Sequence, residues 1–125
     1  INYKNKKILL DGSHNIDGAI NLNYFLKDKN IKPWILFGML NTKKIRKFLS
    51  IIQNQIEGIV AIKIPEEKNA FTANQILKTC KKLKINCVKK NNIREANNFL
   101  FQQSTKYILI TGSLYLVGKL RGKYL

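Results

Sequence analysis

The sequence lacks any apolar run approaching the ~20 residues that a membrane-spanning helix needs. It is also short, since 125 residues suffice for one domain with its own core and not for two. Hydrophobic residues make up 45% and aromatic residues 10% of the chain, which is typical of a soluble globular protein and argues against disorder. The chain begins with Ile1 rather than Met, so we interpret it as a piece of a longer protein.

Cysteine and histidine are scarce, which excludes several kinds of site. Cys80 and Cys87 are too few for a disulfide framework and have no His or Cys partners at zinc spacing, so we expect reduced thiols in a cytoplasmic protein and no metal site. His14 is the one histidine, and no Ser, His and Asp arrangement for nucleophilic catalysis accompanies it. The sequence also lacks G-x-G-x-x-G and G-x-x-x-x-G-K-[ST], so it has no phosphate-cradling loop of its own.

Acidic residues are scarce too, with 7 Asp and Glu against 23 Lys and Arg, which gives a formal net charge of +16. A surplus of this size is typical of a surface that binds nucleic acid or acidic lipid. However, 20 of the 23 basic residues are Lys, and Lys, Asn and Ile, which share AT-rich codons, fill 53 of the 125 positions. Proteins that grip phosphates or bases favour Arg. We therefore attribute the charge mainly to a biased genome.

A basic nucleic-acid-binding module is the alternative class that the charge leaves open. Such modules interleave basic residues with exposed aromatic side chains on which bases stack. The sequence instead predicts core faces or strands for Phe25, Phe48, Phe99 and Trp34. A lack of DNA or RNA retardation at low salt would dispose of this alternative.

Only two prolines and no repeats interrupt the chain, so we expect one domain over residues 1–125. Short apolar runs predict strands at residues 7–10, 34–37, 59–64, 86–89 and 107–110. Between them, apolar residues recur at helical spacing. The predicted helix faces carry Ile16, Ala19, Ile20 and Leu26; Ile45, Phe48, Leu49, Ile52 and Ile56; Ala73, Ile76, Leu77, Cys80 and Leu83; and Ala96, Phe99 and Leu100. Asn15 and Ser113 are placed to cap the first helix and a last short helix through Leu120.

Strands that alternate with amphipathic helices predict right-handed crossovers between parallel strands. We therefore expect an α/β fold: a Rossmann-like three-layer sandwich with a mostly parallel sheet of five or six strands and helices on both faces. Ligands of such sheets bind beyond the carboxyl ends of the strands. The candidate site therefore comprises residues 11–15, 38–42 and 111–113, where the first, second and fifth predicted strands end.

The segment Asp-Gly-Ser-His-Asn at residues 11–15 combines a carboxylate, a flexible glycine, a hydroxyl, an imidazole and an amide at the start of a predicted helix. The carboxylate can accept hydrogen bonds from both hydroxyls of a ribose, and the imidazole can donate to a phosphate or carboxylate oxygen. The same residues also fit an ordinary Asp-Gly turn followed by ordinary helix caps. Chemistry alone leaves both interpretations open here, and also for the Gly-Ser turn at residues 112–113.

The stretch Ile-Leu-Leu-Asp-Gly-Ser-His-Asn at residues 8–15 resembles the Asp-Gly-Ala-His-Asn-Pro motif of the folylpolyglutamate synthase and dihydrofolate synthase family, the folate branch of the Mur ligases. Ile-Leu-Ile-Thr-Gly-Ser-Leu-Tyr-Leu-Val-Gly at residues 108–118 is similar to that family's closing strand and its Gly-Ser-Leu-Tyr-Leu turn. Leu-Phe-Gly-Met-Leu at residues 36–40 resembles its second-strand segment. The departures are small: Ser13 stands for Ala, and Ile16 stands for Pro at the first helical position.

The resemblance implies a Mur-ligase-type C-terminal domain of an ATP-dependent ligase, whose N-terminal ATPase domain lies outside this sequence. Such enzymes phosphorylate a carboxylate of dihydropteroate or a folate, and the amino group of L-glutamate attacks the acyl phosphate. The fragment is therefore expected to be inactive alone, with no catalytic residue assigned in it. A Mur ligase domain of peptidoglycan synthesis is the other alternative. The choice between starting folates and extending them depends on contacts outside this segment.

The resemblance also implies roles for individual residues. Asp11 matches the family's ATP-binding Asp, and His14 and Ser113 match contacts to the transferring phosphate or to glutamate. The supporting turn and helix N-terminus comprise Gly12, Ser13, Asn15 and Gly112. The implied cofactors are ATP and magnesium, bound mainly by the N-terminal domain. The implied partners are that domain, L-glutamate and dihydropteroate or a folate, with no membrane and no nucleic acid.

Overall fold

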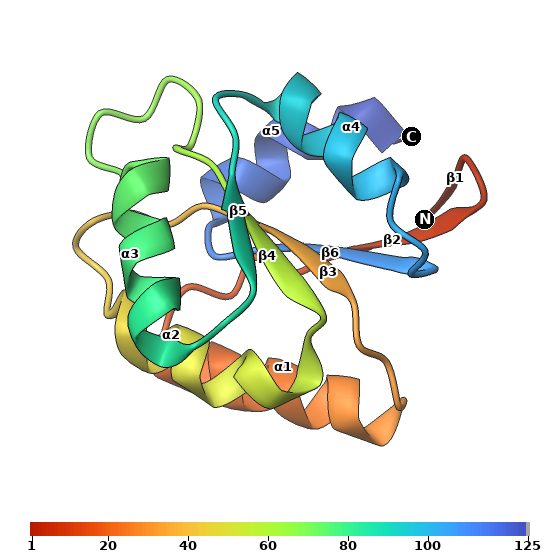
Figure 1. The fold of residues 1–125 in the computed structure, drawn as a ribbon, viewed down its shortest axis with the longest axis horizontal. Helices are drawn as coiled ribbons and strands as arrows, with labels where there is room; N and C mark the ends of the chain where they lie inside the picture. The colour runs from red at the N-terminus through yellow and green to blue at the C-terminus, as the bar shows by residue number, and fades with distance from the viewer. Residues whose placement is uncertain (125) are drawn as a thin grey trace.

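The computed structural model describes residues 1–124 and forms a sheet with helices on both faces (Figure 1). Within this range the strands are β1 (Asn2–Tyr3), β2 (Lys6–Leu10), β3 (Trp34–Phe37), β4 (Gly58–Ala61), β5 (Cys87–Lys89) and β6 (Tyr107–Thr111). The helices are α1 (Ile16–Asp28), α2 (Ile45–Ile52), α3 (Ala73–Leu83), α4 (Ile93–Phe101) and α5 (Leu114–Tyr124), with a short 3-10 turn η1 (Gln53–Gln55) after α2. Among these described helices, none has both the length and the apolar character needed to span a membrane.

Strand β6 is inserted between β2 and β3, although it comes last along the chain. For the described residues the sheet has six strands in the order β1-β2-β6-β3-β4-β5. Neighbours pair in parallel, except that β1 pairs antiparallel with β2. The predicted α/β fold with a mostly parallel sheet is thereby confirmed. The carboxyl ends of β2, β6 and β3 lie side by side, which places the three predicted site segments at one edge of the molecule.

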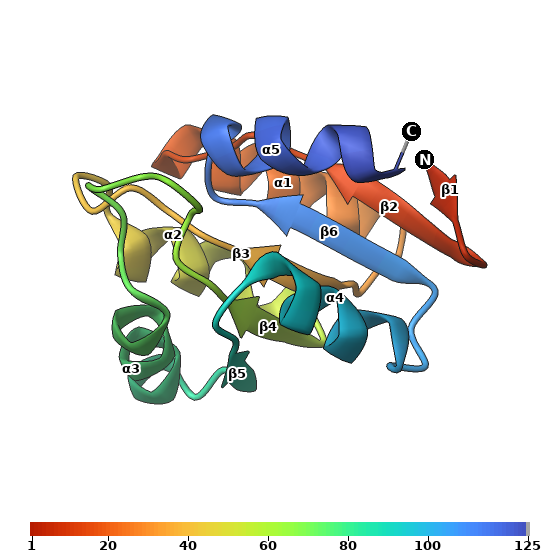
Figure 2. The ribbon, with the colours of Figure 1, turned by 90° about the horizontal axis from the view of Figure 1, so that it is seen from above.

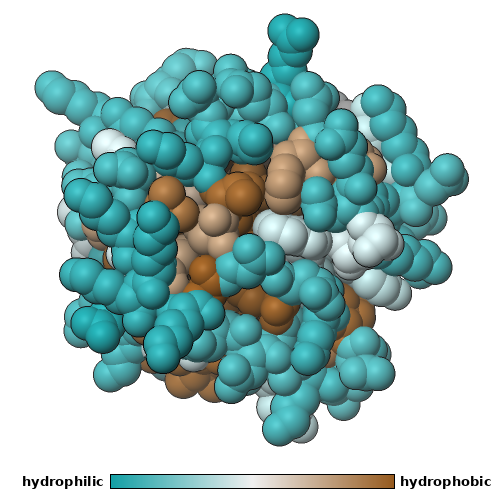
Figure 3. All heavy atoms as spheres, in the orientation of Figure 1, coloured by the Kyte–Doolittle hydropathy of each residue, from teal (hydrophilic) through white to brown (hydrophobic). Residues whose placement is uncertain are grey.

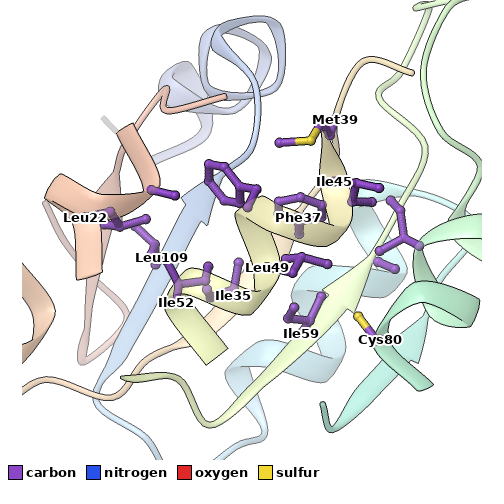
Figure 4. Packing of buried hydrophobic residues seen from close by; sticks show 14 of the residues in the cluster. Leu22, Ile35, Phe37, Met39, Ile45, Leu49, Ile52, Ile59, Cys80 and Leu109 are labelled. Carbon is purple, nitrogen blue, oxygen red and sulfur yellow. The ribbon is translucent and has the colours of Figure 1, made fainter. Parts of the chain in front are cut away.

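The sheet is buried on both faces because α1, α2 and α3 cover one side and α4 and α5 cover the other (Figure 2). Ile35 and Phe37 of β3 point into the first core, whereas Trp34 and Leu36 point into the second. Figure 4 shows the first core, where the rings of Phe37 and Phe48 lie with centroids 5.8 Å apart. Burial on both faces explains why the central strands β3, β4 and β6 read as nearly continuous apolar runs without alternation.

Two apolar residues of α1 face solvent, which corrects the predicted helix face. Ile20 is 51% exposed and Phe25 is 42% exposed. The buried residues of this helix are Ala19, Leu22 and Leu26. They follow the spacing i, i+3 and i+7, which forms a narrow stripe, and Ile20 and Phe25 fall outside it. The prediction of a core position for Phe25 is therefore wrong.

Two predicted boundaries are also wrong, and one strand is missed. The strand expected at residues 59–64 ends at Ala61 as β4, because β3 offers one last carbonyl, that of Phe37, to the N–H of Ile62 at 3.1 Å. The helix expected to include Ile56 ends at Ile52, because Ile56 already has the extended backbone that leads into β4 (φ −132°, ψ 153°). Strand β1 is not predicted, since two residues before a turn are too short for a strand pattern.

Lys6 is a buried cation at the amino end of β2. Its Nζ donates to the carbonyl oxygens of Gln103 at 2.6 Å and Thr105 at 2.5 Å. These carbonyls belong to the connection that follows α4, near the end of a helix, where the dipole favours a positive charge. The lysine therefore fastens β2 to the connection between α4 and β6.

Candidate functional site

Two loops that follow neighbouring strands are joined by hydrogen bonds at the carboxyl edge of the sheet. Residues 11–15 follow β2, and residues 112–113 follow β6. The backbone N–H of Gly112 donates to the carbonyl oxygen of Ser13 at 3.1 Å, and that of Asp11 donates to the carbonyl oxygen of Ile110 at 3.0 Å. The fold therefore brings the two motifs together, although almost a hundred positions separate them.

Position 112 requires glycine for two reasons. Gly112 has a φ of +106°, which residues other than glycine rarely adopt. A Cβ there would also collide with the carbonyl oxygen of Gly38, which lies directly after β3. The loops after β2, β6 and β3 consequently meet in close packing around Gly112.

The carboxylate of Asp11 is folded onto its own loop. Its Oδ1 accepts a hydrogen bond from the backbone N–H of Ser13 at 2.8 Å and another from the Ser13 hydroxyl. This is an Asx turn, so the interpretation of this motif as a turn applies to the structure. Both bonds use Oδ1, which leaves Oδ2 for a further partner.

His14 and Asn15 lead the chain from this loop into α1. The Asn15 side chain accepts from the backbone N–H of Gly18 at 2.8 Å and caps the helix. Nδ1 of His14 lies 3.2 Å from the carbonyl oxygen of Gly12. A carbonyl oxygen only accepts hydrogen bonds, so this contact places a proton on Nδ1 and leaves Nε2 as the nitrogen for a ligand.

Ser113 is buried at the start of α5. Its Oγ accepts from the backbone N–H of Tyr115 at 3.0 Å and of Leu116 at 3.4 Å, which leaves its hydroxyl proton to donate elsewhere. The hydroxyl of Thr111, at the end of β6, is also buried and has no hydrogen-bond partner within the described residues. This edge of the sheet therefore holds one buried hydroxyl, that of Thr111, without a hydrogen-bond partner among the described residues.

Two pockets open beside His14. One has a volume of about 460 Å³, and its lining includes His14, Leu40, Lys43, Gly112, Ser113 and Tyr115. The other has a volume of about 490 Å³, and its lining includes His14, Asn15, Asp17, Thr42, Lys43 and Lys44. His14 and Lys43 are common to both pockets, whereas Asp11 lies outside both linings. Of the predicted residues, the structure therefore places His14, Gly112 and Ser113 around one cavity.

Lys43 is the residue of this site that the sequence patterns do not reveal. It is half-buried and lies one position beyond the segment 38–42, in the loop between β3 and α2. In a chain with 20 lysines, residue type alone does not distinguish it. Only its place at the carboxyl end of the second predicted strand could have identified it.

The arrangement favours an anionic ligand over a metal ion. The positive end of the α1 dipole lies at the site, and Lys43 and Lys44 add positive charge. Within residues 1–124, no group of three or more His, Cys, Asp and Glu side chains is placed to hold a metal ion. One imidazole and a carboxylate that is half used by its own turn do not fit magnesium, which prefers carboxylate and water oxygens.

Comparisons with known proteins cover almost the whole chain. The family model for the C-terminal domain of dihydrofolate synthetase matches residues 1–122. No curated protein matches the chain.

Several solved structures share the fold. E. coli FolC in complex with DHPP and ADP is similar with a TM-score of 0.84 and 20% identity, over 98% of this chain and 30% of that chain. Folylpolyglutamate synthase from Thermotoga maritima is similar with a TM-score of 0.84 and 25% identity, over 99% of this chain and 29% of that chain. A bifunctional folylpolyglutamate synthase/dihydrofolate synthase with Mn, AMPPNP and L-glutamate bound has a TM-score of 0.80 and 19% identity, over 100% of this chain and 30% of that chain. The chain therefore spans about 30% of the length of these proteins.

Proposed function

The chain belongs to the family of dihydrofolate synthetase C-terminal domains, and on this premise we propose that it is part of an ATP-dependent ligase that joins L-glutamate to dihydropteroate or to a folate. The observation that carries the proposal is the junction of the two motif loops, Gly112 to Ser13, beside a cavity lined by His14, Lys43 and Ser113. The relatives solved with ADP, DHPP and L-glutamate support these substrate classes.

The reaction couples two group transfers. The γ-phosphoryl group of ATP moves to a carboxylate of the pterin substrate, which gives an acyl phosphate and ADP. The amino group of L-glutamate then attacks the acyl carbon, an amide bond forms, and inorganic phosphate leaves. Water would hydrolyse the acyl phosphate, so the site has to close during the reaction.

We assign Asp11 to the ribose of ATP. Its Oδ1 holds the turn through Ser13, and its Oδ2 is the oxygen for the ribose hydroxyls. A carboxylate whose loop is fixed by two such bonds and by the Gly112 to Ser13 bond is positioned before the nucleotide arrives. The structural and the functional interpretations of Asp11 are in this way compatible, because they use different oxygens.

We assign the cavity beside Ser113 to L-glutamate. The Ser113 hydroxyl donates to a glutamate carboxylate, and Lys43 supplies a positive charge for it. Nε2 of His14, in the neutral ring that donates from Nδ1, is an acceptor suited to take a proton from the attacking amino group. When the ring is protonated, Nε2 instead donates to a phosphate oxygen.

The remaining machinery belongs to an N-terminal ATPase domain, which would hold the triphosphate and the magnesium ion. Magnesium would neutralise charge on the phosphates, and no residue of this chain is assigned to it. Leu114 and Tyr115 are 64% and 57% exposed at the rim of the cavity. We assign this apolar rim to contact with the N-terminal domain, which would exclude water when it closes.

The test compares this chain alone with the same chain joined to its natural upstream sequence. The longer protein should release ADP only when ATP, L-glutamate and either dihydropteroate or a folate are all present, and the shorter chain should release none. An upstream sequence without a glycine-rich phosphate loop ending in Gly-Lys-Ser or Gly-Lys-Thr would contradict the proposal. Ligation by the 125-residue chain alone would show that the active site is misplaced.

A further inference from the structure

Cys80 and Cys87 are neighbours in the fold, and the proposed ligase chemistry uses neither. Cys80 lies in α3 and is fully buried, whereas Cys87 begins β5 and is half-buried. Between them the chain reverses at Lys84, whose left-handed backbone ends α3. The N–H of Ile85 then donates to the carbonyl oxygen of Cys80 at 2.9 Å, so β5 runs back beneath the helix. Both cysteines consequently contact the same core between α3 and the sheet.

The two thiols affect each other's ionisation, and their environments differ. The Cys87 thiol donates to the carbonyl oxygen of Val88 at 3.7 Å. Its interaction with the Cys80 thiol raises the pKa of Cys80 and lowers the pKa of Cys87. Burial raises the pKa of Cys80 further. At Cys87 burial opposes the lowering of the pKa, and the positive charge of Lys81 adds to that lowering. Cys87 is therefore the member of the pair that forms a thiolate more readily, and the thiolate is the nucleophile in thiol chemistry.

Access from solvent favours the same cysteine. Strand β5 is at the edge of the sheet, with β4 as its partner on one side. In Figure 1 this edge faces the viewer, and Figure 3 shows apolar side chains reaching the surface among hydrophilic ones on that face. A reagent that approaches the edge meets Cys87 first, because α3 covers Cys80.

We propose that Cys87 is a modification site for small disulfides such as oxidised glutathione, and that Cys80 resolves the adduct into an intrachain disulfide. In the first step the Cys87 thiolate attacks one sulfur of the reagent, the reagent's S–S bond breaks, and one reagent thiol leaves. In the second step Cys80 gives up its proton, its sulfur attacks Sγ of Cys87, and the second reagent thiol leaves. The protein is oxidised by two electrons, and the reagent is reduced to two thiols.

The cross-link would join α3 to β5 across the turn at residues 84–86. It lies at the edge of the sheet opposite β1 and β2, away from the cavity beside His14. A disulfide restricts the unfolded chain. Oxidation should therefore raise the melting temperature by several degrees and leave ligand binding at the cavity unchanged.

The test treats the 125-residue chain with excess oxidised glutathione at neutral pH without denaturant, and follows the intact mass and the peptide map. The parent chain should lose the mass of two hydrogen atoms and yield a peptide pair linked through Cys80 and Cys87. The variant Cys80→Ser should stop at a glutathione adduct on Cys87. The matched variant Cys87→Ser should not react, because its remaining thiol is buried.

Reaction of either thiol only after urea is added would identify two inert core cysteines and overturn the proposal. Equal rates for Cys87→Ser and Cys80→Ser would overturn it as well. A measurement on the parent chain guards against variants that do not fold: partial alkylation with a maleimide followed by peptide mapping should label Cys87 before Cys80. The opposite order of labelling would also overturn the assignment.

Discussion

The backbone N–H of Gly112 donates to the carbonyl oxygen of Ser13 at 3.1 Å. This bond connects a loop near the start of the chain with one near its end, and each loop carries one of the motifs that identify the family. Neither loop gains its shape from its own residues alone, because Gly112 also packs against the carbonyl oxygen of Gly38. The site should therefore respond to changes in the backbone as strongly as to changes in its side chains.

Replacing Gly112 with Ala should destabilise the domain. The left-handed φ and the collision with Gly38 together should lower the free energy of unfolding by about 2–4 kcal/mol, measured by urea denaturation. Gly118 is the matched control, since a Cβ there meets nothing within 4 Å in α5. Gly118→Ala should raise the free energy of unfolding by up to about 1 kcal/mol. Equal effects of the two substitutions would contradict the close packing at Gly112.

Replacing Asp11 with Ala in the proposed full-length ligase should affect ATP use more than stability. The free energy of unfolding should fall by only about 1 kcal/mol, because the two turn hydrogen bonds that the variant loses lie in a half-buried loop and not in the core. Loss of hydrogen bonds from ribose hydroxyls to a charged acceptor costs about 1.5–3 kcal/mol, so kcat/KM for ATP should fall roughly ten- to a hundred-fold. Ser13→Ala is the control, because it removes one donor to Oδ1 and keeps the carboxylate. A destabilised Asp11→Ala enzyme with unchanged ATP kinetics would show that Asp11 only stabilises the turn.

Lys43→Gln in the proposed full-length ligase should raise the KM for L-glutamate about tenfold, the loss expected for one hydrogen bond to a charged group. Thermal stability should not change, because Lys43 is half-buried at a pocket and makes no ion pair among those found in residues 1–124. Lys47→Gln is the charge-matched control, since Lys47 is exposed on α2 and lines neither cavity beside His14. An equal rise of the KM for L-glutamate in both variants would show that overall positive charge, and not Lys43 itself, binds the substrate.

Lys6→Met should destabilise the domain by about 1.5–3 kcal/mol, because two partly buried carbonyl oxygens would lose a charged donor. The aliphatic part of the side chain is kept, so lost packing contributes little. Lys32→Met changes the same residue type at an exposed position and should be nearly neutral. Chemical denaturation of both variants measures the difference. If Lys6→Met were also neutral, the two hydrogen bonds would contribute nothing to stability.

Much of the fold follows from patterns that burial imposes on the sequence. The run at Trp34–Phe37 and the run at residues 108–110 are apolar throughout because helices cover both of their faces. The residues that face solvent on α1 do not follow such a rule. Ile20 is apolar yet exposed, and apolar side chains at the surface are common enough that residue type alone cannot place them.

The candidate site also has residues that the sequence predicts and residues that it does not. Residues 11–15 and 112–113 are predictable because turns and helix caps require particular residue types at particular positions. Lys43 is not predictable, because its role depends on where the loop after β3 lies relative to His14, and many other lysines have equivalent sequence surroundings. The use of Oδ1 of Asp11 within its own turn is a matter of side-chain geometry, which spacing along the chain does not define.

The central place of β6 also bears on how the domain is made during translation. Strands β2 and β3 each pair with β6 and not with each other. Until the ribosome has released residues 107–111, no sheet hydrogen bonds join the β1–β2 pair to the strands β3, β4 and β5. The edges of β2 and β3 that later pair with β6 stay unpaired until then. A nascent chain stalled before Tyr107 should therefore be sensitive to proteases and depend on chaperones, and one stalled after α5 has emerged should resist digestion.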